Sequence, residues 1–154
     1  MEVTTEPSLS TKLLSLGFFL LLTISSGTWF AISSINLISD IRYQAPVIAY
    51  DEGSMYMLGC TIGLLGVLAG GAYYVLLGRK LPKKVERILI RIMLSGVVIM
   101  FVFPHVANFY VESEIEHSKY YICEKLTYEW LLYKKYYYTD TPETCRKLVA
   151  EKGK

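Results

Sequence analysis

The cysteines near the C-terminal end are the residues of this sequence with the clearest chemistry to offer, formation of a disulfide. Cys123 and Cys145 lie in the polar segment 112–154, whereas Cys60 lies inside a long apolar run, where we expect a small packing residue. Two cysteines in an oxidising compartment form a natural disulfide pair. Because two thiols and a distant His117 do not make a recognisable zinc spacing, we predict a Cys123–Cys145 disulfide and no metal site.

A second group of polar residues lies within three long apolar runs, toward one end of each run. Such residues could line a recess that water reaches from outside the membrane. They could also be interfacial side chains or bond to neighbouring backbone, which is the interpretation we favour. The candidate recess residues are Ser33, Asn36, Thr61, His105 and Asn108. No Asp or Glu lies deep in any run, which argues against an ion-coupled transporter.

Catalytic motifs are absent from the sequence. There is no glycine-rich phosphate loop, no G-x-S-x-G and no H-E-x-x-H. We therefore expect a protein that is not an enzyme and that binds no cofactor. The net charge of the chain is only +2, and six of its sixteen Lys and Arg residues form a block between two apolar runs, so nucleic acid is not an expected partner.

The three apolar runs are the elements that must position these residues. Leu13–Leu37, Ser54–Gly78 and Ile92–Val111 contain no charged residue. About 20 helical residues cross a hydrocarbon core about 30 Å thick, so each run is long enough to span a membrane. We predict transmembrane helices at about 13–37, 54–78 and 89–111, which form a bundle over residues 1–111.

The first run could instead be a cleaved signal peptide. Ala31 and Ser33 are placed as in an A-x-A-like cleavage site. The apolar stretch is longer than a usual signal-peptide core, however, and the residues before it include Glu2, Glu6 and only Lys12. We therefore favour a retained first span.

Charge distribution predicts the orientation of the spans. Residues 38–53, between the first two runs, carry three acidic residues and one basic residue, a net charge of −2. The segment after the second run has six basic residues and one acidic residue, a net charge of +5: Arg79, Lys80, Lys83, Lys84, Arg87 and Arg91, with Glu86. Short basic loops stay in the cytoplasm. We predict a cytoplasmic loop 79–88, an N-terminus inside, and a C-terminal segment 112–154 outside.

Glycines recur along the second run at intervals of four, three and four. This spacing places them on one helical face, where the missing side chains allow a neighbouring backbone to approach closely. The face could form a homodimer, or it could pack against another span of the same chain, which we favour. The residues are Gly59, Gly63, Gly66 and Gly70.

The segment 112–154 is predicted to be a small helical tail that the disulfide stabilises. Ile122, Leu126, Trp130 and Tyr133 follow helical spacing, which predicts a helix over about 118–133. Disulfide closure requires this helix to stop near Lys134, so that residues 135–140, whose tyrosines prefer strand, fold back. The sequence Thr141-Pro142-Glu143 predicts the start of a second helix. The predicted fold class is an all-α membrane protein.

Aromatic residues are abundant in the same segment. Tyr and Trp favour the membrane interface, where a ring can face lipid and its polar atom water. They are also enriched in protein-binding surfaces. The candidate residues for a partner surface are Tyr121, Trp130, Tyr133, Tyr136, Tyr137 and Tyr138.

Together these features resemble the small polytopic inner-membrane proteins of bacteria that act as immunity proteins to membrane-targeting toxins. The resemblance covers the whole chain and rests on its size, the three spans, the turn Arg79-Lys80-Leu81-Pro82-Lys83-Lys84, and a tail with Tyr121-Ile122-Cys123, Trp130 and Cys145. It implies a non-enzymatic protein of the bacterial inner membrane that binds a toxin at its outer, periplasmic face or within the bilayer and blocks pore formation or access. The alternatives are an accessory subunit of a larger membrane complex and, less favoured, a small transporter.

Overall fold

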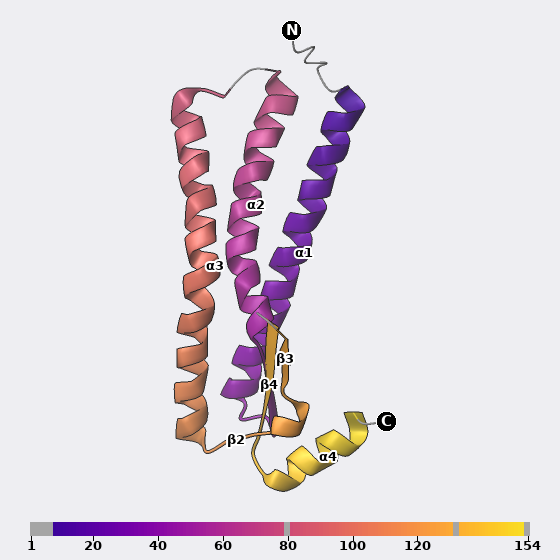
Figure 1. The fold of residues 1–154 in the computed structure, drawn as a ribbon, viewed down its shortest axis with the longest axis vertical. Coiled ribbons are helices and arrows are strands. Elements are labelled where there is room, and N and C mark those ends of the chain that lie inside the picture. Colours follow the sequence, from indigo (N-terminus) through magenta and orange to yellow (C-terminus); the bar gives the residue numbers. More distant parts are fainter. Residues whose placement is uncertain (1–7, 79–80, 131–132, 153–154) are drawn as a thin grey trace.

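The computed structural model describes residues 8–78, 81–130 and 133–152, and three long helices dominate it (Figure 1). They are α1 (Leu9–Arg42), α2 (Glu52–Leu77) and α3 (Lys83–Ser118), with α2 between the other two. All three are long and apolar enough to cross a membrane, which confirms the predicted set of span-like helices. Residues 79 and 80 of the predicted loop 79–88 lie outside the described residues.

The helix ends follow from local chemistry. The side chain of Asp51 caps the start of α2, because its Oδ1 accepts a hydrogen bond of 3.2 Å from the backbone N–H of Ser54. At the other end of α2, Gly78 adopts a left-handed conformation with φ of 60°, which glycine tolerates without steric cost. Helix α1 has 34 residues and α3 has 36, so each is about 50 Å long and extends beyond a hydrocarbon core.

A small antiparallel sheet occupies the end of the bundle where α2 begins. Its strands are β1 (Val47–Asp51), β2 (Tyr121–Ile122), β3 (Tyr128–Trp130) and β4 (Tyr133–Thr139). Strand β4 pairs with all three others, in the order β1-β4-β2 with β3 also beside β4. The other described elements are the short 3-10 helix η1 (Glu124–Leu126) and the helix α4 (Pro142–Lys152).

The predicted helical tail is therefore wrong in its first part. The described residues 119–130 form no long α-helix, and helix α3 continues instead to Ser118. The spacing of Ile122, Leu126, Trp130 and Tyr133 allowed a helix, but the strand-forming tyrosines pair with β1, a segment that lies between the first two spans. This long-range pairing overrides the local pattern. The segment predicted to fold back, residues 135–140, corresponds to most of β4, and α4 begins at Pro142 as predicted.

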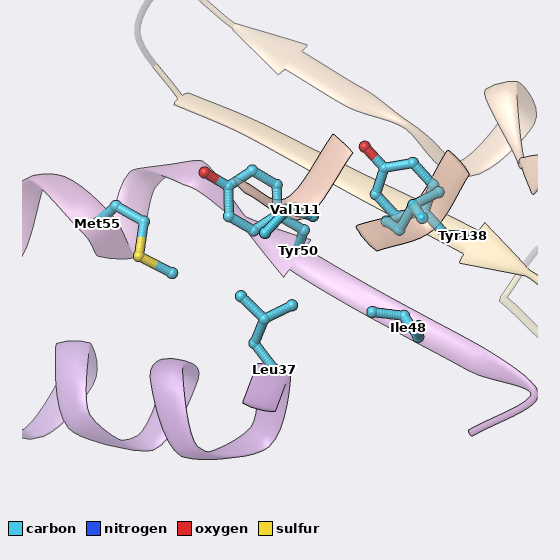
Figure 2. Close-up of a cluster of buried hydrophobic side chains, with 7 residues drawn as sticks. Leu37, Ile48, Tyr50, Met55, Val111 and Tyr138 are labelled. Atoms are coloured by element: carbon cyan, nitrogen blue, oxygen red, sulfur yellow. The ribbon is translucent and has the colours of Figure 1, made fainter. Parts of the chain in front are cut away.

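The hydrophobic core lies where the sheet meets the helices (Figure 2). Because α2 starts only at Glu52, strand β1 fills the space between the projecting ends of α1 and α3. Its side chains Ile48 and Tyr50 are buried there. The core residues from all these elements are Leu37, Ile48, Tyr50, Met55, Val111, Ile115 and Tyr138.

Close backbone contact joins α2 to α3 along the glycine face. A Cβ added at Gly59 would collide with the backbone of Met100, and one added at Gly96 of α3 would lie 2.7 Å from the backbone nitrogen of Gly63. A Cβ at Gly66 would lie 2.8 Å from Met93, and one at Gly70 would make only ordinary contact with Leu89, at 3.4 Å. The chain's own α3 covers this face, so a homodimer through it would have to displace α3.

We expect Gly59→Ala to destabilise the bundle and Gly63→Ala to be tolerated. The new methyl at position 59 meets backbone that cannot move aside, a type of overpacking that costs about 1–3 kcal/mol. At position 63 an added Cβ meets nothing within 4 Å. Thermal unfolding of the two purified variants in the same detergent measures the difference. Equal melting temperatures would contradict the close α2–α3 contact.

Candidate functional site

A disulfide lies at the end of the sheet where β2 pairs with the last residues of β4. Cys123 follows β2 and Cys145 lies in the first turns of α4, and their Cα atoms are 5.7 Å apart across the bond. The predicted Cys123–Cys145 disulfide is thus confirmed. Cys123 is buried, and its backbone N–H donates a hydrogen bond of 2.8 Å to the carbonyl of Tyr137. The disulfide and this hydrogen bond together therefore connect α4 to the central strand β4.

A groove lies between η1 and α4, and its two walls are joined by this disulfide. Its volume is about 440 Å³. The lining mixes apolar and charged side chains: Ile122, Glu124, Lys125, Cys145, Arg146, Val149 and Ala150. No motif in the sequence predicted this groove. The cysteine pairing could have indicated it, because the residues beside two bonded cysteines must face one another.

Three of the predicted surface tyrosines belong to the core or to the contact with α2. Tyr138 is only 3% exposed. The ring of Tyr136 stacks between those of Tyr50 and Tyr138, with centroid distances of 6.2 and 6.3 Å. The Tyr133 ring lies against Gly53, and its hydroxyl donates a hydrogen bond of 3.4 Å to the Oδ2 atom of Asp51.

The other candidate aromatic residues differ in exposure and position. Tyr121 is 57% exposed and Trp130 is 65% exposed. Tyr137 is half-buried and interacts with the ammonium group of Lys135, 5.6 Å from its ring centroid. Tyr121 pairs with Thr139 at one end of β4, whereas Trp130 pairs with Tyr133 at the other. The six predicted residues therefore do not form one continuous surface.

The predicted polar recess residues occupy separate environments. The Thr61 hydroxyl lies 3.0 Å from that of Ser26 and donates to the Met57 carbonyl, so it links α1 to α2. Asn108 donates a hydrogen bond of 3.0 Å to the Oε1 atom of Glu112. His105 and Asn36 are exposed and Ser33 is half-buried; the five predicted residues are Ser33, Asn36, Thr61, His105 and Asn108.

A buried polar cluster, which the sequence pattern did not predict either, lies at the start of α2. Glu52 is 9% exposed, and it interacts electrostatically with Lys134 of β4. Within the described residues, the buried hydroxyl of Tyr50 and the buried Oδ1 atom of Asn108 have no hydrogen-bond partner. Burial raises the pKa of Tyr138 to about 12, and the charge of Glu112 adds to the shift. Burial also raises the pKa of Tyr50, with Glu52 contributing.

Metal ligands do not gather at either place. Within residues 8–78, 81–130 and 133–152, no group of three or more His, Cys, Asp or Glu side chains could hold a metal ion. The chemistry that these sites offer is contact, hydrogen bonding and charge pairing.

The fold and these sites define a class: a protein with three span-like helices and a disulfide-linked sheet at one end of the bundle. Residues 48–146 match the model of the family described as "Protein of unknown function (DUF1240)", and the chain belongs to this family. The match runs from β1 to the residue after Cys145, so it includes the β1–β4 pair and both bonded cysteines. No curated protein and no solved structure matches the chain. The resemblance to immunity proteins stays a prediction.

We expect folding stability to fall at alkaline pH because of the buried tyrosines. An unfolded tyrosine ionises at about pH 10, whereas folded Tyr138 stays neutral until about pH 12. A raised folded pKa contributes stability that is present below the unfolded pKa and is lost as the pH rises toward the folded pKa. For Tyr138 this loss is at most about 2–3 kcal/mol. Thermal unfolding monitored by circular dichroism from about pH 9 upward measures it.

The matched variants are Tyr138→Phe and Tyr43→Phe, since Tyr43 is 79% exposed. The quantity to compare is the slope of stability with pH, which does not depend on a constant cost of either substitution. The slope should become shallower in Tyr138→Phe and stay unchanged in Tyr43→Phe. The same slope in both variants would contradict the burial of Tyr138.

Proposed function

We propose that this protein is a non-enzymatic, multi-pass membrane protein that binds a protein partner through its sheet end. The observation that carries the proposal is the η1–α4 groove with exposed Tyr121 and Ile122 nearby and with walls held by a disulfide. Covalent closure reduces the ordering cost of binding, because the walls are already in place. A mixed lining of apolar and charged residues suits a protein segment more than a purely apolar ligand.

The proposed location of the sheet end is the periplasmic side of a bacterial inner membrane. The described basic residues Lys83, Lys84 and Arg87 lie at the start of α3, at the opposite end of the bundle from the sheet (Figure 1). The positive-inside rule puts that start in the cytoplasm. A disulfide on the sheet side is consistent with an oxidising compartment there.

Cysteine labelling tests this orientation with two exposed positions at opposite ends of α3. In a Cys60→Ser background, Ser118→Cys should react with an impermeant maleimide in intact spheroplasts, because it lies at the sheet end. Lys84→Cys should react only after the membrane is opened. The reverse pattern would overturn the proposed orientation and with it the periplasmic binding site.

The partner that the sequence resemblance suggests is a toxin that acts on the membrane or in the periplasm. Binding at the sheet end would hold such a toxin at the membrane surface and block its insertion or access. In the groove, Lys125 and Arg146 would pair with acidic groups of the partner, and Ile122 would contact an apolar side chain. The proposal needs no reaction and no cofactor.

Protection of cells from a toxin encoded beside the gene tests the function. Cells that express the toxin should survive only when this protein is also present. We expect Ile122→Ala combined with Arg146→Ala to abolish protection, because both side chains line the proposed groove. Tyr43→Ala should protect normally, since Tyr43 lies at the end of α1 and is 79% exposed. Equal amounts of each variant in the membrane must be verified by immunoblotting.

Full protection by the double variant would contradict this binding surface, and lack of protection by the natural chain would contradict the immunity function.

A second function, accessory subunit of a larger membrane complex, is favoured by a separate observation. An apolar groove of about 300 Å³ lies between α1 and α3 and is lined mainly by Leu37, Ile38, Met55, Phe103 and Val106. Co-purification with a constant set of membrane proteins would favour that alternative.

A further inference from the structure

We propose that the outer face of β3, together with the start of β4, docks into the lipid interface of the membrane that the helices span. We define this surface, the aromatic hairpin face, as Tyr128, Trp130 and Tyr133. It is separate from the η1–α4 groove, and the partner assigned to it is the lipid surface itself.

The position of Tyr133 supports this proposal. Tyr133 lines a cavity of about 310 Å³ together with Trp29 of α1, Met57 of α2 and Phe101 of α3. These three residues come from the three charge-free runs of the sequence. The start of β4 therefore lies beside the span-like helices and not in the part of the sheet that projects beyond them. Figure 1 shows β3 and β4 running alongside the helices.

The side chains on this face have the chemistry of a membrane interface. Tyr128 and Trp130 lie two residues apart on β3, so they point to the same side of the strand. They are 54% and 65% exposed, and the Tyr128 ring contacts that of Tyr133 in a T-shaped arrangement. Trp and Tyr rings are stable at the headgroup level, where one edge is apolar and the other is wet.

Charged residues border the face, as expected at the edge of a bilayer. Glu129 and Lys134 form an exposed ion pair with an N–O distance of 3.7 Å. Both belong to the same two strands, but their side chains alternate with the aromatic ones. Long basic side chains such as Lys134 can extend toward water while the strand lies against lipid.

Backbone hydrogen bonding limits how deep the strands can lie. Among the described strands, β3 pairs with β4 alone, and an open strand edge does not occur within the hydrocarbon core. The hairpin must therefore lie at headgroup level. Asp51 and Glu52, the charged residues at the start of α2, mark the same boundary. Met57 comes five residues later, about 7–8 Å deeper along the helix, and Trp29 lies near it.

The two tryptophans of the chain provide a depth measurement. Trp29→Phe leaves Trp130 as the only tryptophan, and Trp130→Phe leaves Trp29. Each full-length variant is reconstituted into vesicles of phosphatidylcholine that is brominated either near the carboxyl end or near the methyl end of the acyl chain. We expect Trp130 emission to be lost mainly with bromine near the carboxyl end. Trp29 emission should be lost relatively more with the deeper bromine.

Quenching by iodide in the aqueous phase tests the opposite outcome, in which Trp130 is exposed to water. Strong loss of Trp130 emission with iodide, and none with either brominated lipid, would overturn the proposal and make this face available to a protein partner. Strongest loss with the deeper bromine would also overturn it, since the strands would then lie in hydrocarbon. If Trp29→Phe fails to fold, subtracting the emission of Trp130→Phe from that of the natural chain isolates Trp130. Neither result depends on toxin protection, so the proposed function can fail independently.

Discussion

The antiparallel pairing of β1 with β4 is the interaction on which the rest of the structure depends. It joins the segment between the first two helices to a strand near the C-terminal end, with Tyr50 opposite Tyr136. Two further hydrogen bonds extend the connection: the Tyr120 hydroxyl donates to the Ala45 carbonyl at 2.9 Å, and the Asp140 N–H donates to the Pro46 carbonyl at 3.2 Å. Without this pairing, β1 would be an unpaired loop, and the projecting ends of α1 and α3 would have no common core.

Two different kinds of packing meet at this pairing. Along the helices, contact between backbones at Gly59, Gly63 and Gly96 provides association where no hydrophobic drive exists between apolar surfaces in lipid. At the sheet end, Ile48, Tyr50 and Tyr138 form a buried apolar core, as in a water-soluble domain. The change from one kind of packing to the other occurs at the start of α2, where Asp51 caps the helix and Glu52 is buried.

The central strand separates the proposed roles of the sheet by distance. β4 has seven residues, so its two ends are about 20 Å apart. Trp130 lies at the end near the helices, in the position proposed for lipid contact. Tyr121 and the disulfide lie at the other end, beside the groove proposed for a partner. The lipid-docked strands would hold the groove at a fixed height above the bilayer, so a partner that approaches the membrane would meet it there.

The sequence by itself determined the three span-like helices, the disulfide and the start of α4, because these depend on local composition, on hydropathy and on the presence of only two cysteines outside the apolar runs. It also identified the aromatic residues but not their separation into core and surface. Only the tertiary structure decided that Tyr138 is buried and Tyr136 partly buried while Trp130 is exposed, that η1 and α4 enclose a groove, and that the glycine face meets α3. The physical reason is that strand pairing is non-local: the register between β1 and β4 fixes which tyrosine faces the helices, and nothing in the local spacing of residues 118–139 specifies a partner so far away in the chain.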